Sequence, residues 1–172
     1  MKKLFIGLML VGLTTPFFGQ GVSDQIKTIE LAEVNILALN STYVNRVIDK
    51  NAAEPVQHLE RKAAAFDITV SDLFSEEFDT YEVNFENKVG RITATYDVDG
   101  EIMRSYEKFK DVKVPFAVSK SIANKFPDWS TKSTTYLVNY KHNGELTRIY
   151  KISLEKGKEH MNIKTDELGN IL

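Results

Sequence analysis

The chain has 172 residues, with 22 Lys and Arg against 24 Asp and Glu, a formal net charge of −2, and no cysteine. The absence of cysteine excludes disulfides, thiol nucleophiles, thiolate zinc sites and redox-active thiol pairs. A mature domain of about 150 residues can still bury a core large enough to fold without such cross-links.

The N-terminus has the pattern of a secretory signal peptide over residues 1–19. Lys2 and Lys3 precede an apolar run over residues 4–13, which is too short to span a bilayer, and a broken stretch follows it. Cleavage after Gly19 puts bulky Phe17 where a small residue is expected, whereas cleavage after Gly21 puts Gly19 there, and both sites stay open. We therefore expect a periplasmic or secreted protein with no integral membrane segment after cleavage. A retained anchor is the alternative, although no stop-transfer pattern follows.

Residues 20–53 are predicted to form an N-terminal strand and a connector. Ile29 and Leu31, then Val34 and Ile36, alternate in two registers, which favours a strand over residues 28–38. A short helix is the alternative there. Residues 39–53 are predicted as a loop followed by a short helix or strand.

The rest of the chain is predicted to contain one unit twice, as repeat 1 over residues 54–109 and repeat 2 over 110–172. The segment 55–66, PVQHLERKAAAF, returns as 115–126, PFAVSKSIANKF, and YEVNF at 81–85 returns as YLVNY at 136–140. Proline in the first turn and apolar residues at helical spacing predict helices at 54–66 and 115–126.

The segments after each helix alternate between apolar and polar residues, which predicts antiparallel strands. Strands are expected at 81–85, 92–98, 101–109, 134–140, 145–154 and 159–165, with a last strand ending at Leu172. Asp99-Gly100, Asn143-Gly144 and Lys156-Gly157-Lys158 supply turns. The expected class is α+β, with each helix laid across a small antiparallel sheet. Its expected core comprises Leu59, Ala63, Phe66, Val118, Ile122 and Phe126 against Val83, Phe85, Ile92, Val138, Ile152 and Leu154.

Three motifs carry a family resemblance over roughly residues 54–172. They are Val114-Pro115 with Phe126-Pro127-Asp128-Trp129, the stretch YKISLEKG at 150–157, and the closing Asp166 with GNIL at 169–172. With these motifs the chain resembles the PepSY-like family of exported Bacteroidetes proteins, whose halves are similar in fold to the tandem domains of β-lactamase inhibitory protein. The region around residues 28–49 and the Phe-Gly-Gln end of the signal peptide look like a flavobacterial version. The resemblance implies a tandem fold and an exported, non-enzymatic binding or inhibitor-like module.

The expected function is recognition of a protein or peptide through the sheet face that the helices leave open. Trp129, Tyr136 and Tyr140 are the candidate binding residues, because large aromatic side chains are common anchors in interfaces. Trp129 could instead cap the second helix and pack on the sheet edge. A structural envelope protein without a ligand site is the first alternative.

Catalytic, metal-binding and cofactor-binding residues are not expected. His58, His142 and His160 lack metal-ligand spacing, and His142-Asn-Gly144-Glu145 lacks the second histidine of a nucleotidyltransferase motif. Asp97-Val-Asp99-Gly100-Glu101 fits a hairpin turn better than a calcium loop. A carboxylate-based hydrolase is the second alternative function, and it would require two of the following residues to converge in a closed pocket: Asp72, Glu76, Glu77 and Asp79.

Charge is distributed unevenly along the chain. Residues 20–103 hold 7 Lys and Arg against 16 Asp and Glu, whereas residues 104–164 hold 13 against 6. The basic half lacks an aromatic stacking motif for nucleic acid, so no nucleic-acid partner is expected. The asymmetry could steer a partner, or it could simply reflect the solvated faces of two unrelated repeats.

Overall fold

The computed structural model describes residues 38–172. The predicted signal peptide and almost all of the predicted N-terminal strand lie outside these residues. Three helices and six strands are assigned in the described part of the chain: α2 (Ser41–Val47), α3 (Glu54–Ala64), β1 (Thr80–Glu86), β2 (Gly90–Asp97), β3 (Ile102–Lys110), α4 (Phe116–Lys125), β4 (Ser130–Lys141), β5 (Leu146–Lys156) and β6 (Glu159–Thr165). The protein is an α+β protein, as predicted.

Both helices that were expected from the repeat are present, and their sequences explain their ends. In α3, Pro55 occupies the first turn beside Glu54. Arg61 and Lys62 lie in the last turn, where their positive charges interact favourably with the negative end of the helix dipole. Pro127 follows α4 after Phe126, whose backbone has left the helical region. The connector before α3 forms the short helix α2, one of the two alternatives left open for it.

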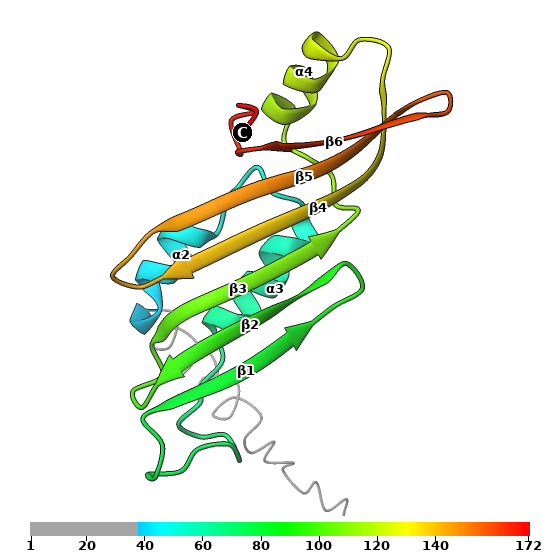
Figure 1. The fold of residues 1–172 in the computed structure, drawn as a ribbon. Coiled ribbons are helices and arrows are strands. Elements are labelled where there is room, and N and C mark those ends of the chain that lie inside the picture. Colours follow the sequence, from blue (N-terminus) through cyan, green and yellow to red (C-terminus); the bar gives the residue numbers. More distant parts are fainter. Residues whose placement is uncertain (1–37) are drawn as a thin grey trace, which may run out of the picture.

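All six strands join in one antiparallel sheet, in the order β1-β2-β3-β4-β5-β6 (Figure 1). Strands β3 and β4 are hydrogen-bonded neighbours, so the strands of the two predicted repeats form one continuous sheet. Along the chain, α3 precedes β1 to β3 and α4 precedes β4 to β6. A helix followed by three antiparallel strands therefore occurs twice.

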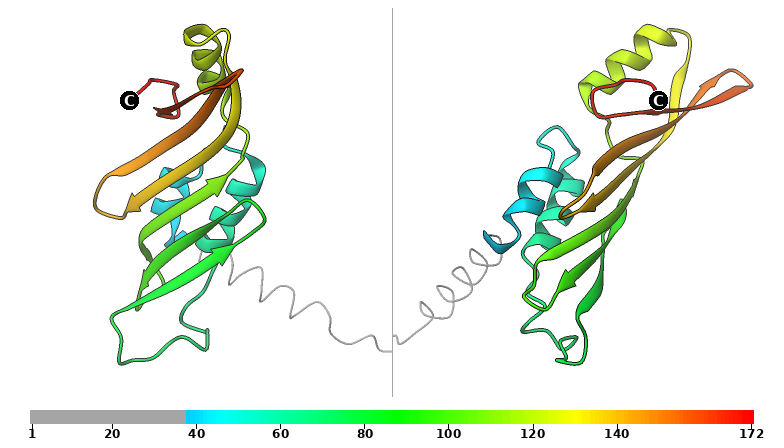
Figure 2. Two further views of the ribbon diagram at one scale, coloured as in Figure 1. Left: turned by 45° about the vertical axis from the view of Figure 1, so that its right-hand side comes forward. Right: turned by 60° about the vertical axis from the view of Figure 1, so that its left-hand side comes forward.

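The helices lie on one side of this sheet, and the other side carries no described element (Figures 1 and 2). The strand registers place Phe85, Ile92, Glu107, Val138 and Arg148 in one cross-strand row on the helix side. The helix-side face is buried in the described fold, whereas the opposite face, here called the open face, is polar and largely exposed. This is the usual division in an antiparallel sheet with helices on one side.

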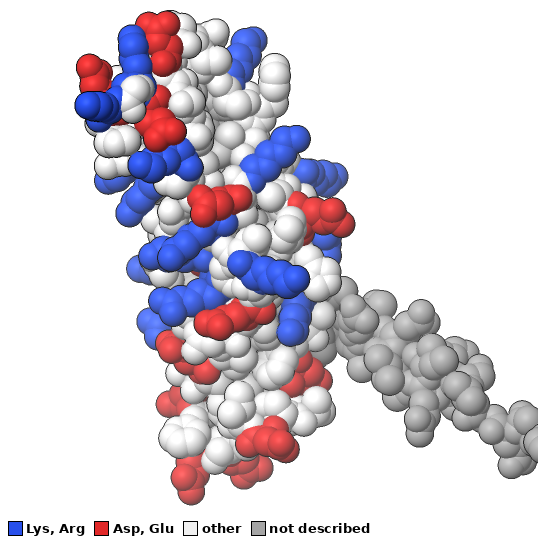
Figure 3. Space-filling model, turned by 90° about the vertical axis from the view of Figure 1, so that its right-hand side faces the viewer, with Lys and Arg blue, Asp and Glu red and all other residues white. Residues whose placement is uncertain are grey.

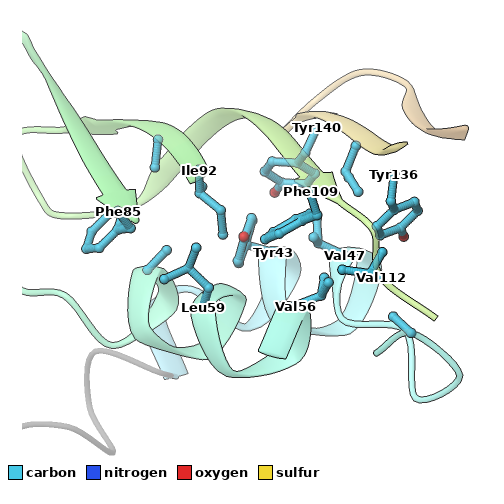
Figure 4. Packing of buried hydrophobic residues seen from close by; sticks show 14 of the residues in the cluster. Tyr43, Val47, Val56, Leu59, Phe85, Ile92, Phe109, Val112, Tyr136 and Tyr140 are labelled. Atoms are coloured by element: carbon cyan, nitrogen blue, oxygen red, sulfur yellow. The ribbon is translucent and has the colours of Figure 1, made fainter. Parts of the chain in front are cut away.

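The apolar core fills the space between the helices and the sheet (Figure 4). Nine of the twelve expected core residues are buried, and Phe66, Val83 and Phe126 are partly buried against the same cluster. The core is rich in aromatic rings: Tyr136 stacks on Tyr150 with ring centroids 4.3 Å apart, and Tyr43 meets Tyr140 edge-on at 5.3 Å. Aromatic pairs of this kind add to the stabilisation that burial provides.

Two arginines fasten α2 to the sheet. Arg46 donates to the backbone carbonyls of Lys141, His142 and Gly144, in and next to the turn between β4 and β5. In the opposite direction, Arg148 of β5 donates to the carbonyls of Arg46 and Val47 at the C-terminal end of α2. A helix of only seven residues is held in place by these contacts between distant parts of the chain.

The expected last strand is wrong. After β6 the chain turns at Asp166 to Gly169, and only an isolated bridge between Thr165 and Ile171 follows. The tight turn is closed by hydrogen bonds to Asp166, and after it Leu172 donates its N–H to the carbonyl of Lys164 over 3.0 Å. The C-terminus therefore covers one end of β6 without becoming a seventh strand.

Candidate interaction surface

Tyr136 and Tyr140 lie on the helix side of the sheet, so the expectation that they line the open face is wrong. Both side chains are at most 1 % exposed, and Figure 4 shows them directed toward the helices. The physical reason is strand parity: both share a face of β4 with Val138, and α2 and α3 cover that face. Trp129 follows α4 and is partly buried against the core.

The residues considered for catalysis or metal binding are dispersed. Asp72, Glu76, Glu77 and Asp79 are all exposed on the loop before β1, so no pair of them shares a closed pocket. In the part of the chain that the structure describes, no three His, Asp or Glu side chains are grouped to hold a metal ion. The Asp97 carboxylate accepts the N–H groups of Asp99 and Glu101, which confirms the hairpin turn.

A pair of buried carboxyl groups, which the sequence analysis missed, lies between α3 and β3. Glu60 and Glu107 are both 0 % exposed. Oε1 of Glu107 accepts the Tyr43 hydroxyl over 2.9 Å and the Ser105 hydroxyl over 2.7 Å. No hydrogen-bond donor of the described residues reaches Oε2 of Glu107 or either carboxyl oxygen of Glu60. Glu60 and Glu107 are instead hydrogen-bonded to each other, and two carboxyl groups can make such a bond only when one of them is protonated.

The electrostatics of the pair agree with a shared proton. Burial, followed by the neighbouring Glu107 carboxyl, raises the pKa of Glu60 to about 9. Burial raises the pKa of Glu107 to about 7, and the Ser105 and Tyr43 hydroxyls restrain that rise by hydrogen bonding. Because both groups are sealed from solvent, no substrate can reach them in this structure. The pair belongs to the core.

Two sequence patterns could have revealed this pair. Glu60 is four residues after Val56 and three before Ala63, so it occupies the apolar face of α3. In β3, Ser105 and Glu107 alternate in phase with Phe109, so they share its buried face. A charged residue on an apolar face at both places indicates that the two could meet.

The open face carries Lys and Arg side chains in directly opposed pairs. Arg91 lies opposite Lys108, Arg104 opposite Lys141, and Lys151 opposite Lys164. Directly opposite side chains in an antiparallel sheet have Cβ atoms roughly 4.5–5.5 Å apart, so each pair sets two positive charges close together. These three like-charged pairs, here called the basic pairs, extend over β2 to β6. Figure 3, which views the molecule from the side, shows many Lys and Arg side chains over its middle, Asp and Glu at its lower end, and both kinds of charge at its upper end.

The basic pairs have few counter-charges. Within the described residues, none of their six side chains is in an ion pair with a carboxylate. In the registers of the described strands, Glu86 on β1 is the acid directly opposite a member of these pairs, Arg91, and Glu82 lines the same hollow as Arg104 and Lys141.

Each basic pair borders a shallow hollow of the open face. One of about 280 Å³ is lined in part by Arg104, Tyr106 and Lys141. A second of about 310 Å³ includes Lys151 and Lys164, and a third of about 420 Å³ includes Arg91 and Lys108.

Apolar side chains lie between the basic pairs. Leu137 of β4 is directly opposite Ile149 of β5, and Lys108 flanks Leu137 on the other side. Tyr106, 44 % exposed, projects from β3 on the same face. Apolar and aromatic contacts ringed by charge are the composition expected of a protein-binding surface.

In comparisons with known proteins, the sequence matches no protein-family model and no curated protein. Among the described residues, no helix is both long enough and apolar enough to cross a membrane.

Proposed function

We propose that the protein is an exported, non-catalytic binding module that recognises an acidic protein or peptide through its open sheet face. The observation that carries this proposal is the set of three basic pairs without ion-pair partners. The binding residues are then the basic pairs with Tyr106, Leu137 and Ile149. Tyr136 and Tyr140 act behind them as core residues that hold the strands in register.

The energetics of the sheet favour an anionic partner. Like charges directly opposite each other destabilise an antiparallel pair. Carboxylates placed between the basic pairs would remove that repulsion on binding. The positive field of the face would also accelerate encounter with an acidic surface, most strongly at low salt.

The tandem architecture and the kinship with PepSY-like exported proteins are part of this proposal. Their support is the repeated order of one helix and three strands. Further support comes from the turns at Asp97 and Asp166, each of which accepts, through its Oδ1, the N–H groups two and four residues later. The backbone bonds that close the two turns correspond as well.

A matched pair of triple variants tests the surface. The test variant carries Lys108→Gln, Lys141→Gln and Lys151→Gln, one from each basic pair. The control carries Lys50→Gln, Lys62→Gln and Lys120→Gln, which are exposed and lie outside the open face. Both variants lose the same charge. The probe is a synthetic peptide of alternating Glu and Tyr, titrated by calorimetry at two salt concentrations.

We expect the test variant to bind the acidic peptide on the order of tenfold more weakly than wild type, with the control close to wild type. Equal weakening of both variants would show that net charge, and not the open face, controls binding. Absence of binding by the wild-type protein would favour the structural envelope role.

A further inference from the structure

The edge strand β1 is a second surface, with the opposite charge. In the described fold, β1 pairs with β2 on one side and with no strand on the other. The opposite edge differs, because the bridge from Thr165 to Ile171 and the hydrogen bond of Leu172 cover one end of β6. Among the described residues, no strand or bridge pairs with the outer edge of β1, and the loop before β1 contacts only the side chain of Tyr81 at its N-terminal end.

Strand β1 has only acidic side chains to protect its edge. Proteins block edge strands with charged residues, proline, a bulge or a very short strand. The seven residues TYEVNFE contain neither proline nor lysine, and their register with β2 runs without a shift from Thr80 to Glu86. An edge of this length whose only charges are acidic is a template for an added strand of opposite charge.

The hairpin geometry identifies the free backbone groups. Asn87 donates its N–H to the carbonyl of Gly90, so these residues form a hydrogen-bonded pair. Such pairs alternate along an antiparallel ladder, so Phe85, Val83 and Tyr81 bond to β2. The backbone groups of Glu82, Asn84 and Glu86 are therefore directed outward from the sheet.

We infer that the outer edge of β1 accepts an extended peptide as an added strand, and that this peptide alternates basic and apolar side chains. The side chains of Glu82 and Glu86 lie on the open face, where basic residues of an added strand would stand beside them. On the helix-side face, the side chain of Tyr81 contacts the loop that contains Phe78. Phe78 is 57 % exposed. The Tyr81 hydroxyl donates to the carbonyl of Phe78 over 3.2 Å. Apolar residues of the added strand would continue this face.

Charge also discriminates against a second copy of the protein. An antiparallel pairing of two β1 strands centred on Asn84 would place Glu82 of each copy opposite Glu86 of the other. Like charges directly opposite are unfavourable, and the exposed acids of the loop before β1 add to the repulsion. The same acids attract a basic strand. Strand addition supplies affinity through the backbone and specificity through alternate side chains.

The decisive variant is Asn84→Pro, with Asn84→Ala as its matched control. The Asn84 N–H points away from β2, so proline removes one outward donor without removing a bond to β2. Both variants lose the hydrogen bond from Thr93 to the Asn84 side chain. The probes are a blocked peptide of alternating Lys and Val and the same peptide with a central valine replaced by proline. Binding is measured by calorimetry, and strand addition by amide hydrogen exchange of residues 80–86.

We expect the Lys-Val peptide to bind wild type and Asn84→Ala alike, and to bind Asn84→Pro on the order of tenfold more weakly. Bound peptide should slow exchange of the outward amides of Glu82, Asn84 and Glu86. The proline-interrupted peptide keeps its charge and should bind poorly. Equal binding of the two peptides, equal binding to both Asn84 variants, or no binding to wild type would overturn the inference. Slow exchange of these amides in the free protein would also overturn it, because the edge would then already be covered. The acidic probe used for the open face has the opposite charge, so the two proposals fail independently.

Discussion

Replacing Glu60 by glutamine should stabilise the protein at alkaline pH, and the effect should vanish near pH 5. The folded-state pKa of Glu60 is raised from 4.5 to about 9, so the folded protein holds a proton that the unfolded chain releases. Stabilisation from this group is therefore fully present below about pH 4.5 and is lost as pH rises toward 9. Glutamine does not titrate, and its amide can donate to Oε2 of Glu107 in place of the shared proton.

The size of the effect follows from the shift. Each pH unit over which one proton is retained on folding changes the free energy of unfolding by about 1.4 kcal/mol. Between pH 5 and pH 8 the limit for one proton is thus about 4 kcal/mol. We expect the advantage of Glu60→Gln over wild type to grow by at least about 2 kcal/mol across this range, or roughly 6 °C in melting temperature for a domain of this size.

Urea unfolding at pH 5, 6.5 and 8, followed by the fluorescence of the single tryptophan, measures this difference. The control is Glu77→Gln, which changes the net charge equally at an exposed position. Its difference from wild type should stay near zero at every pH. If the Glu60→Gln advantage does not grow with pH, or the variant is less stable than wild type at pH 8, the two carboxyls do not share a proton.

Two further stability predictions follow from backbone contacts. Arg46→Ala removes the donors to three carbonyls and should lower the free energy of unfolding by about 1.5–3 kcal/mol, because each bond involves a charged group. Arg46→Lys should recover only part of the lost free energy. A loss below about 0.5 kcal/mol in either variant would contradict this role for Arg46. Gly169→Ala should lower the stability of the fold more than Gly157→Ala. Both glycines have positive φ, 84° at Gly169 and 62° at Gly157. A Cβ at Gly169 would lie 2.6 Å from the carbonyl oxygen of Ala117, whereas none of the described atoms lies within 4 Å of a Cβ at Gly157. We expect about 1 kcal/mol at Gly157 and more than about 2 kcal/mol at Gly169 from thermal unfolding, and equal losses would refute the steric contribution.

The sequence determined the local elements, because their causes are local. Proline in the first turn and helical spacing of apolar residues located α3 and α4, and period-two alternation located all six strands and the residues that share a face of each. The turn at Asp97 was equally evident from its own five residues. Among the described residues, the predicted strand that is missing is the last one, where the chain turns at Asp166 and forms only an isolated bridge between Thr165 and Ile171.

The tertiary structure decided which face of each strand is covered, and this decided the candidate site. Alternation places Tyr136, Val138 and Tyr140 on one face and Leu137 with Lys141 on the other, but it cannot say which face the helices occupy. The basic pairs depend on the registers between neighbouring strands, and Glu60 meets Glu107 only because α3 packs across a sheet that continues through both repeats. These juxtapositions join residues far apart in the chain, so packing, and not local preference, sets them.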